Sequence, residues 1–165
     1  MAGITAAVCL RHDRLMTVVI RTAVVADLDA VRGVFRRASL SNDGDREHLL
    51  AHPEALVLSD DGIREERTRL AVEPGGRVVG FASWIVRGDT IEMEDLFVEP
   101  QWMRRGIGLA LVLDMVDIAD RRMFSRLEVT ANPHAREFYE RAGFIADHVV
   151  ETDFYPAQRM HRSVP

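Results

Sequence analysis

The chain has 165 residues, of which 47% are hydrophobic and 28% are charged. A chain of this length can bury roughly 68–70% of the surface that it exposes when unfolded, which supports an ordinary folded domain and argues against disorder. The formal net charge of -5 argues against a protein whose main task is to bind nucleic acid. Cys9 is the single cysteine, which excludes an internal disulfide framework and indicates a reducing, cytoplasmic setting. No apolar run approaches the ~20 residues that a membrane helix needs.

The N-terminal residues are interpreted separately from the rest. Residues 4–10 are apolar, but no basic segment precedes them and charged residues follow at once, so they do not form a secretory signal. Met16 stands directly before the first convincing strand, residues 17–22. We therefore interpret residues 1–15 as an extension that is either disordered or the result of a misassigned start. Residues 16–165 are expected to form a single domain.

The pattern of apolar residues predicts alternating strands and helices. Short links at 74–76 and 87–89 join three strands into an antiparallel meander. The segment 41–45 is typical of a loop. The whole order indicates an α/β protein, with a mixed sheet and helices on its faces. Strands are predicted at 17–22, 68–73, 77–86, 90–98, 124–130, 144–150 and 158–163, and helices at 26–37, 46–51, 106–122 and from Asn132 to Gly143.

The most informative segment is a strand followed by a basic turn and an amphipathic helix. The turn contains Arg104, Arg105, Gly106 and Gly108. Glycines let the backbone approach a ligand closely, and the helix N-terminus and the arginines favour an anion. The segment therefore predicts a phosphate or pyrophosphate site. A dinucleotide fingerprint is excluded because Leu111 stands where its third glycine would be, and a Walker loop is excluded because Gly-Lys-Ser/Thr is absent.

A second segment, one strand further on, carries the pattern Asn-x-x-Ala-x-x-x-Tyr-x-x-x-Gly-Phe. Its five matching residues are Asn132, Ala135, Tyr139, Gly143 and Phe144. With this segment and the basic turn, the sequence resembles the GCN5-related N-acetyltransferase (GNAT) superfamily, as a small single-domain bacterial-type member. The resemblance is strongest over residues 78–144. It implies the GNAT fold, in which a central mixed, mostly antiparallel twisted sheet of six or seven strands is flanked by about four helices.

The resemblance also implies a donor and its binding residues. The donor is acetyl-CoA, and no metal is expected, because the six histidines form no metal-binding spacing. Met103 departs from the family pattern, which has Gln or Arg there, and Arg104 stands where glycine is common. Arg104 or Arg105 is therefore expected to supply the missing contact. The residues assigned to the donor are Leu96, Phe97 and Val98 for the pantetheine arm, Met103, Arg104, Arg105, Gly106, Ile107 and Gly108 for the pyrophosphate, and Asn132 and Tyr139.

The chemistry requires a proton acceptor, because a lysine-like amine has a pKa near ~10.4 and is mostly protonated at neutral pH. Glu92 and Glu94 alternate onto one face of their strand, and Glu92 lies where some family members carry a catalytic glutamate. Both are predicted candidates, acting directly or through a water, although they could equally form an exposed strand face; Glu128 is a remoter candidate. The resemblance assigns Tyr139 as the acid for the departing thiolate, with ring packing as the alternative. Asn132 is expected to cap its helix as well as contact the donor.

The sequence thus predicts an acyl-CoA-dependent N-acyltransferase that transfers acetyl to a primary amine by direct attack on the thioester. The alternative is a non-catalytic acyl-CoA-binding regulatory module, which would lose the acid and base residues. The expected acceptor is a small-molecule or peptide amine, without nucleic acid or membrane partners. The resemblance is also compatible with a homodimer. No motif in the sequence identifies the acceptor.

Overall fold

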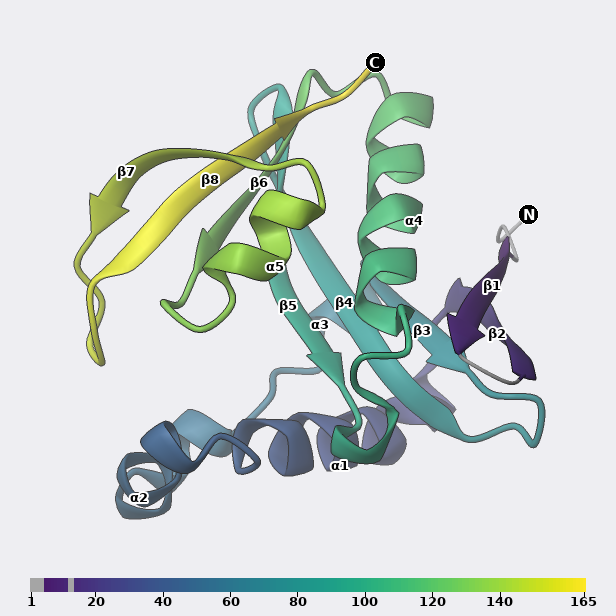
Figure 1. Ribbon diagram of the computed structural model, residues 1–165, viewed down its shortest axis with the longest axis horizontal. Coiled ribbons are helices and arrows are strands. Elements are labelled where there is room, and N and C mark those ends of the chain that lie inside the picture. The colour runs from purple at the N-terminus through teal and green to yellow at the C-terminus, as the bar shows by residue number, and fades with distance from the viewer. Residues whose placement is uncertain (1–4, 12–13) are drawn as a thin grey trace. The chain divides into compact units, whose positions relative to one another are not determined.

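The computed structural model describes residues 5–11 and 14–165 (Figure 1). The chain divides into two compact units. Unit 1 comprises Met1–Ser83 and Asp95–Leu111, and unit 2 comprises Trp84–Glu94 and Val112–Pro165. The strands are β1 Thr5–Arg11, β2 Arg14–Thr22, β3 Thr68–Val72, β4 Val78–Arg87, β5 Thr90–Val98, β6 Arg126–Ala131, β7 Ile145–Val150 and β8 Ala157–Ser163.

The hydrogen-bonded strand order is β1-β2-β3-β4-β5-β6-β8-β7. This mixed, mostly antiparallel arrangement confirms the predicted fold class. The sheet has eight strands rather than six or seven, because β1 adds a strand in the segment interpreted as an extension. The helical elements are η1 Val25–Asp27, α1 Leu28–Ser39, α2 Asp43–Ala51, η2 Pro53–Leu56, α3 Asp61–Arg64, η3 Pro100–Trp102, α4 Ile107–Arg121 and α5 Arg136–Arg141. Within the described ranges, no helix is both long and apolar enough to cross a membrane.

Unit 1 is built on antiparallel pairing of β1 with β2, β2 with β3 and β3 with β4. The helix α1 buries Val31, Val34 and Phe35, which recur at helical spacing, in a core that also contains Leu70 and Phe81. Their neighbours in sequence on the outer side of the helix are exposed. The predicted helix over 26–37 is therefore confirmed, and its apolar stripe fixes one face of the unit 1 sheet.

The segment after α1 departs from the prediction of a loop over 41–45. The helix α2 begins at Asp43, beyond the C-terminal end of α1 (Figure 1). Asn42 caps it, because its side-chain oxygen accepts a hydrogen bond from the Gly44 N–H at 3.0 Å. Asn and Asp favour helix caps and turns for the same reason, since their short side chains bond to nearby backbone groups. The residues over 41–45 that predicted a loop therefore form the start of α2.

In unit 2, β5 pairs with β6 in parallel, and β8 lies between β6 and β7 with antiparallel pairing on both sides (Figure 1). The parallel ladder begins at Thr90↔Arg126 and its last pair is Met93↔Val129. Beyond that pair β6 continues only in its ladder with β8, to Ala131. The two strands therefore stop pairing before either of them ends.

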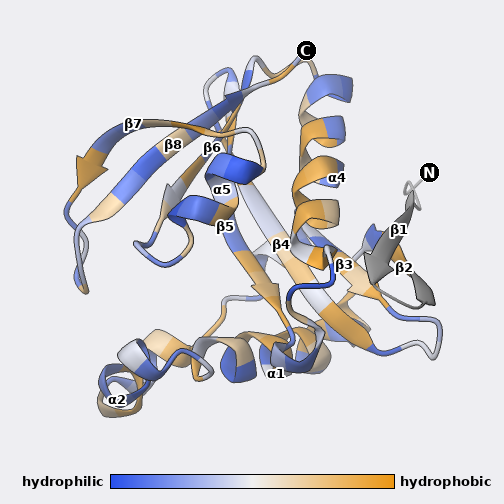
Figure 2. Cartoon of the chain, in the orientation of Figure 1, coloured by the Kyte–Doolittle hydropathy of each residue, from blue (hydrophilic) through white to orange (hydrophobic). Residues whose placement is uncertain are grey.

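The two helices of the motif segments differ in character. Figure 2 shows that α4 is mostly apolar, whereas α5 is mostly hydrophilic. The helix α5 starts later than predicted, at Arg136, and ends before Gly143, whose φ is 86°. Asn132 nevertheless caps the turn leading into it, because its Oδ1 accepts a hydrogen bond from the Ala135 N–H at 2.8 Å. The prediction that Asn132 is the N-cap of the helix is therefore wrong in position: the N-cap of α5 is Ala135, because the helix starts later and Asn132 closes the turn before it.

Candidate active site

The structure divides the predicted site residues between the two units. Unit 1 contains the donor-binding candidates of the strand end and the basic turn, and unit 2 contains the acid and base candidates with Asn132. The members in unit 1 are Leu96, Phe97, Val98, Met103, Arg104, Arg105, Gly106, Ile107 and Gly108, and those in unit 2 are Glu92, Glu94, Asn132 and Tyr139.

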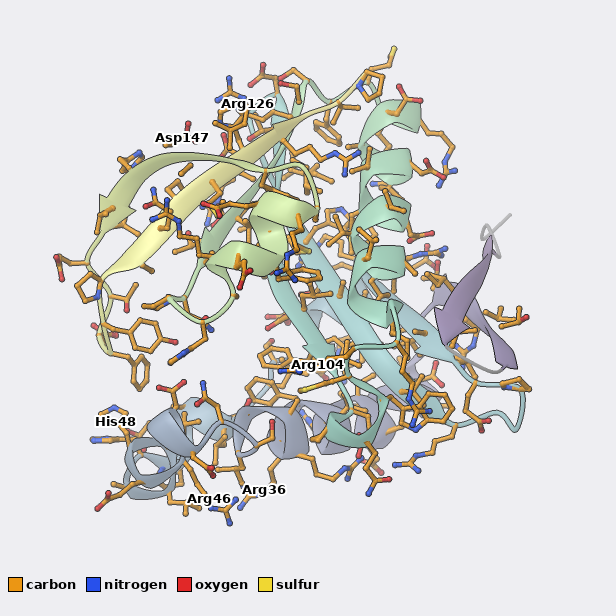
Figure 3. All side chains as sticks on the ribbon, in the orientation of Figure 1. Arg36, Arg46, His48, Arg104, Arg126 and Asp147 are labelled. Atoms are coloured by element: carbon orange, nitrogen blue, oxygen red, sulfur yellow. The ribbon has the colours of Figure 1, made fainter. Side chains whose placement is uncertain are left out.

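The basic turn between η3 and α4 has an unusual backbone. Arg104, labelled in Figure 3, has a φ of 58° and Gly106 a φ of 81°, so both adopt the left-handed conformation, whereas Arg105 between them does not. Alternation of this kind points successive N–H groups toward one side, which suits an anion. Arg104 therefore occupies, with a side chain, the conformation that glycine adopts without steric cost. Arg104 is exposed, as are Met103 and Gly106, whereas Arg105 is half-buried.

The start of α4 is fixed by close packing in unit 1. Ile107 is 2% exposed. A Cβ added to Gly80 of β4 would lie 3.1 Å from the Phe97 carbonyl oxygen and 3.2 Å from the Ile107 side chain. The absence of a side chain at Gly80 therefore lets the helix start approach the sheet. Arg105 is also held, because its guanidinium lies 4.7 Å from the centre of the Trp102 ring.

At the end of β5, before the turn, the side chains pack within unit 1, whereas the predicted functional role belongs to the backbone. Phe97 packs its ring edge-on against Phe35 at 4.9 Å and stacks with Phe81 at 5.6 Å, so its side chain belongs to the unit 1 core. Leu96 and Val98 are half-buried. The role predicted for these three residues concerns their backbone, which the side-chain packing keeps in place.

In unit 2, Glu92 belongs to a polar network on the strand face. Arg159 of β8 donates hydrogen bonds to Glu92 at 2.7 Å, to Glu128 at 2.5 Å and to Thr130 at 2.9 Å. Arg87 adds a second ion pair to Glu92 at 3.5 Å. The hydrogen bond from Arg159, opposed by partial burial, lowers the pKa of Glu92. The alternation of Glu92 and Glu94 predicted one shared face, but no sequence signal identified Arg159, which lies 67 residues away along the chain from Glu92.

Tyr139 is 6% exposed. Its ring packs edge-on against Phe138 at 5.1 Å and Phe144 at 5.3 Å. The packing fixes the ring, so that the direction of the phenol is set by its neighbours. Glu94, by contrast, is exposed.

Asp95 is a carboxylate that the sequence reasoning missed. Ser83 donates a hydrogen bond to it at 2.5 Å, and no described residue forms an ion pair with it. Burial raises the pKa of Asp95, and the Ser83 hydrogen bond only partly offsets this effect. A carboxylate with a raised pKa is a stronger proton acceptor than one held by arginines.

Over the residues that the structure describes, no group of three His, Cys, Asp or Glu side chains could hold a metal ion.

The comparisons with known proteins agree with this geometry. The model of the acetyltransferase (GNAT) family matches residues 34–144, which include the basic turn, β5, β6 and α5. The chain therefore belongs to the GNAT acetyltransferase family. The predicted resemblance and the predicted enzyme class, an N-acetyltransferase, are both confirmed.

Individual relatives show how far the similarity extends. Glucosamine 6-phosphate N-acetyltransferase of Trypanosoma brucei brucei is 30% identical over 113 residues, which cover 60% of this chain and 77% of that protein. An uncharacterised N-acetyltransferase of Methanocaldococcus jannaschii is 33% identical over 98 residues, 53% of this chain and 43% of its own length, so the chain spans less than half of that relative. The structure of PaiA N-acetyltransferase from Thermoplasma acidophilum with coenzyme A has a TM-score of 0.67 at 17% identity, covering 87% of this chain and 97% of that one. This last likeness establishes the fold.

The left-handed conformation of Arg104 predicts a measurable strain. Arg104→Gly should raise the free energy of unfolding by about 0.5–1 kcal/mol, since glycine removes the steric cost but adds chain entropy to the unfolded state. Chemical denaturation of both proteins measures the difference. Gly106→Ala is the matched comparison and should be destabilising, because it introduces the same strain. A loss of stability in Arg104→Gly would show that contacts of the arginine side chain outweigh the backbone cost.

Proposed function

We propose that this protein transfers an acetyl group from acetyl-CoA to the primary amine of a small molecule or peptide. The observation that carries the proposal is the basic turn before α4, with its left-handed Arg104 and Gly106, in a chain of the GNAT family. In the reaction, the amine nitrogen bonds to the thioester carbonyl carbon and the carbon–sulfur bond breaks. The amine loses a proton, and the departing thiolate gains one.

The turn fits a pyrophosphate. Arg104 and Arg105 provide formal positive charge, and the N-terminus of α4 adds its dipole and unsatisfied N–H groups. Met103 has no donor to offer, so the arginines replace the side chain that other family members use. We propose no metal for the reaction, since the arginines and N–H groups can neutralise the phosphate charge.

For the acyl end, we propose that the backbone of Leu96, Phe97 and Val98 pairs with the pantetheine arm and polarises the thioester carbonyl. The early end of the β5–β6 ladder, after Met93↔Val129, supports this role. A strand that stops pairing with its neighbour leaves backbone groups for another extended partner.

For the proton, we propose Glu92 as the acceptor, through a water. Its pairing with Arg159 keeps it ionised at neutral pH, and two arginines hold its orientation. Asp95 is the competing carboxylate, because its raised pKa makes it the stronger base. Glu94 is the exposed alternative on the face of Glu92.

We propose that the phenol of Tyr139 donates the proton to the thiolate, as its place in the family segment implies. For the acceptor, we propose only its chemical class, a primary amine of a small molecule or peptide. The Trypanosoma relative acts, by its name, on glucosamine 6-phosphate. We also propose that the protein is located in the cytoplasm and forms a homodimer.

The donor assignment is tested by thermal unfolding with acetyl-CoA, using ATP and NAD as controls. A ligand that binds only the folded protein stabilises it by about 2.7 kcal/mol at 100 times its Kd. We expect a clear rise in Tm with acetyl-CoA alone. No rise at millimolar acetyl-CoA would contradict the proposed function, and a rise without thiol release in an amine screen would favour the binding module.

Two glycine variants make this test specific. Gly106→Asp should abolish the rise in Tm, because it adds backbone strain and a negative charge to the basic turn. Gly76→Asp introduces the same residue at a φ of 91°, in a β3–β4 turn where an added Cβ meets nothing within 4 Å. The Gly76 variant should keep the full rise in Tm, and an equal loss in both would refute the pyrophosphate assignment.

The base assignment is tested by pH–rate profiles of thiol release. Glu92→Gln should lower kcat/KM roughly 100-fold at neutral pH with an unchanged Kd for acetyl-CoA. Arg159→Gln should raise the pKa of Glu92, because the arginine lowers it, and should therefore move the acid limb of the profile to higher pH. A normal rate in Glu92→Gln, combined with a lost rate in Asp95→Asn, would assign the base to Asp95 instead.

The acid assignment is tested by Tyr139→Phe, which keeps the ring packing against Phe138 and Phe144. We expect kcat at saturating substrates to fall roughly 100-fold, with Tm and the Kd for acetyl-CoA unchanged. An unchanged kcat would leave Tyr139 with a packing role alone.

A further inference from the structure

Glu99, directly after β5, is a buried carboxylate with two arginine partners. Its side chain is only 3% exposed. Arg37 of α1 binds it through two bonds, Nε to Oε1 at 2.6 Å and Nη2 to Oε2 at 3.1 Å. Arg77, just before β4, adds a contact of 3.3 Å. One carboxylate therefore joins the end of β5, the helix α1 and the start of β4, all within unit 1.

The backbone of Glu99 is fixed as firmly as its side chain. Its N–H donates to the Val79 carbonyl at 2.9 Å, and its own carbonyl accepts from the Trp102 N–H at 2.8 Å. A buried carboxylate is costly to desolvate, and a well-packed apolar group often stabilises a fold as well. Stability alone therefore does not explain a charged group at this position.

The contacts of Glu99 lead to the basic turn. The bond from Trp102 closes the η3 turn, and the Trp102 ring in turn lies 4.7 Å from the Arg105 guanidinium. Arg104 follows in its strained left-handed conformation. Arg104 and Gly106 are exposed and Arg105 is half-buried, so packing alone does not hold the turn and its geometry depends on the anchor at its base.

The charge of Glu99 matters as much as its bonds. A lone carboxylate at the base of a turn that binds a pyrophosphate would repel the ligand. The guanidinium groups of Arg37 and Arg77 neutralise it, while Arg104 and Arg105 keep their own charge for the ligand. The arrangement anchors the turn without lowering its positive potential.

We propose that Glu99 is a positioning residue for the donor: held by Arg37 and Arg77, it fixes Trp102 and thereby Arg105 in the place that the pyrophosphate of acetyl-CoA requires. The inference rests on the proposed function and deepens it, since it assigns Glu99 and Arg37 a role in holding the turn that suggested the donor.

The experiment compares two donors in the Glu99→Gln variant. S-acetylpantetheine carries the same thioester as acetyl-CoA but lacks the pyrophosphate. We expect Glu99→Gln to lower kcat/KM for acetyl-CoA about ten- to hundredfold through KM, with kcat at saturation retained. The kcat/KM for S-acetylpantetheine should stay within about twofold of the original protein, because Glu99 acts only on the pyrophosphate end.

The Arg37 variants test the charge argument. Arg37→Gln should raise KM for acetyl-CoA more than Glu99→Gln does, because it leaves a buried carboxylate short of a partner beside the turn. The double variant, Arg37→Gln with Glu99→Gln, should recover part of that loss. An equal or additive loss in the double variant would overturn the coupling between the two residues.

A second ion pair of unit 1 provides the matched control. Asp27 binds Arg21 through two bonds of 2.7 and 2.8 Å and contacts no part of the basic turn. Asp27→Asn therefore removes a similar pair, and it should leave the ratio of the two donors unchanged. A change of that ratio in Asp27→Asn, or an equal loss for both donors in Glu99→Gln, would reduce Glu99 to a structural role.

The outcomes separate the two proposals. If the original protein neither binds acetyl-CoA nor releases thiol from it, the proposed function fails. If it does both and Glu99→Gln keeps the original donor ratio, only the role of Glu99 fails. Should Glu99→Gln not fold, Arg77→Gln tests the same anchor, since Arg77 is half-exposed and makes the longest of the three contacts. It should show the same change in donor ratio to a smaller extent.

Discussion

The chain reversal between β5 and α4 is the constraint on which the functional part of unit 1 depends. The backbone must leave a strand, turn and enter a helix whose first residue, Ile107, is buried. Gly80 permits the close approach, and Arg104 and Gly106 adopt left-handed conformations to complete the turn. A turn built this way cannot satisfy its own N–H groups within a helix or a ladder. The same geometry that is costly for folding therefore supports the proposed binding of an anion at this turn.

Much of this fold follows from local patterns in the sequence. Nearly all predicted strands and helices are present, because alternation of apolar residues and helical spacing report directly on burial. The errors have particular causes. The segment 41–45 contains residues that serve turns and helix caps alike, and β1 pairs with β2 in a segment that was interpreted as an extension. Strand count was therefore the least predictable part of the fold.

The site was predictable only where it is a contiguous motif. The basic turn and the segment around Tyr139 are local, so their spacing could be matched to a family. The partners of the charged residues are not local. Arg159 reaches Glu92 from β8, and Arg37 reaches Glu99 from α1. Such pairs depend on tertiary register, which no short window of sequence contains, and the pair with Arg159 lowers the pKa of Glu92.

Glu92 and Asp95 of β5 and Glu99 after it carry the same chemical group, but their surroundings suit them to different roles. Glu92 and Glu99 are both held by arginines, which fix their orientation, and the hydrogen bond from Arg159 lowers the pKa of Glu92. Asp95 has a hydroxyl partner instead, and burial raises its pKa. An arginine-held carboxylate is well suited to hold geometry or to orient a water, but it is a weak base. A desolvated carboxylate without a cation is the stronger base but is less firmly oriented. The arginines, rather than the carboxylates themselves, therefore divide the proposed roles: Glu92 is oriented to accept a proton through a water, Asp95 is its competitor, and Glu99 holds the turn in place.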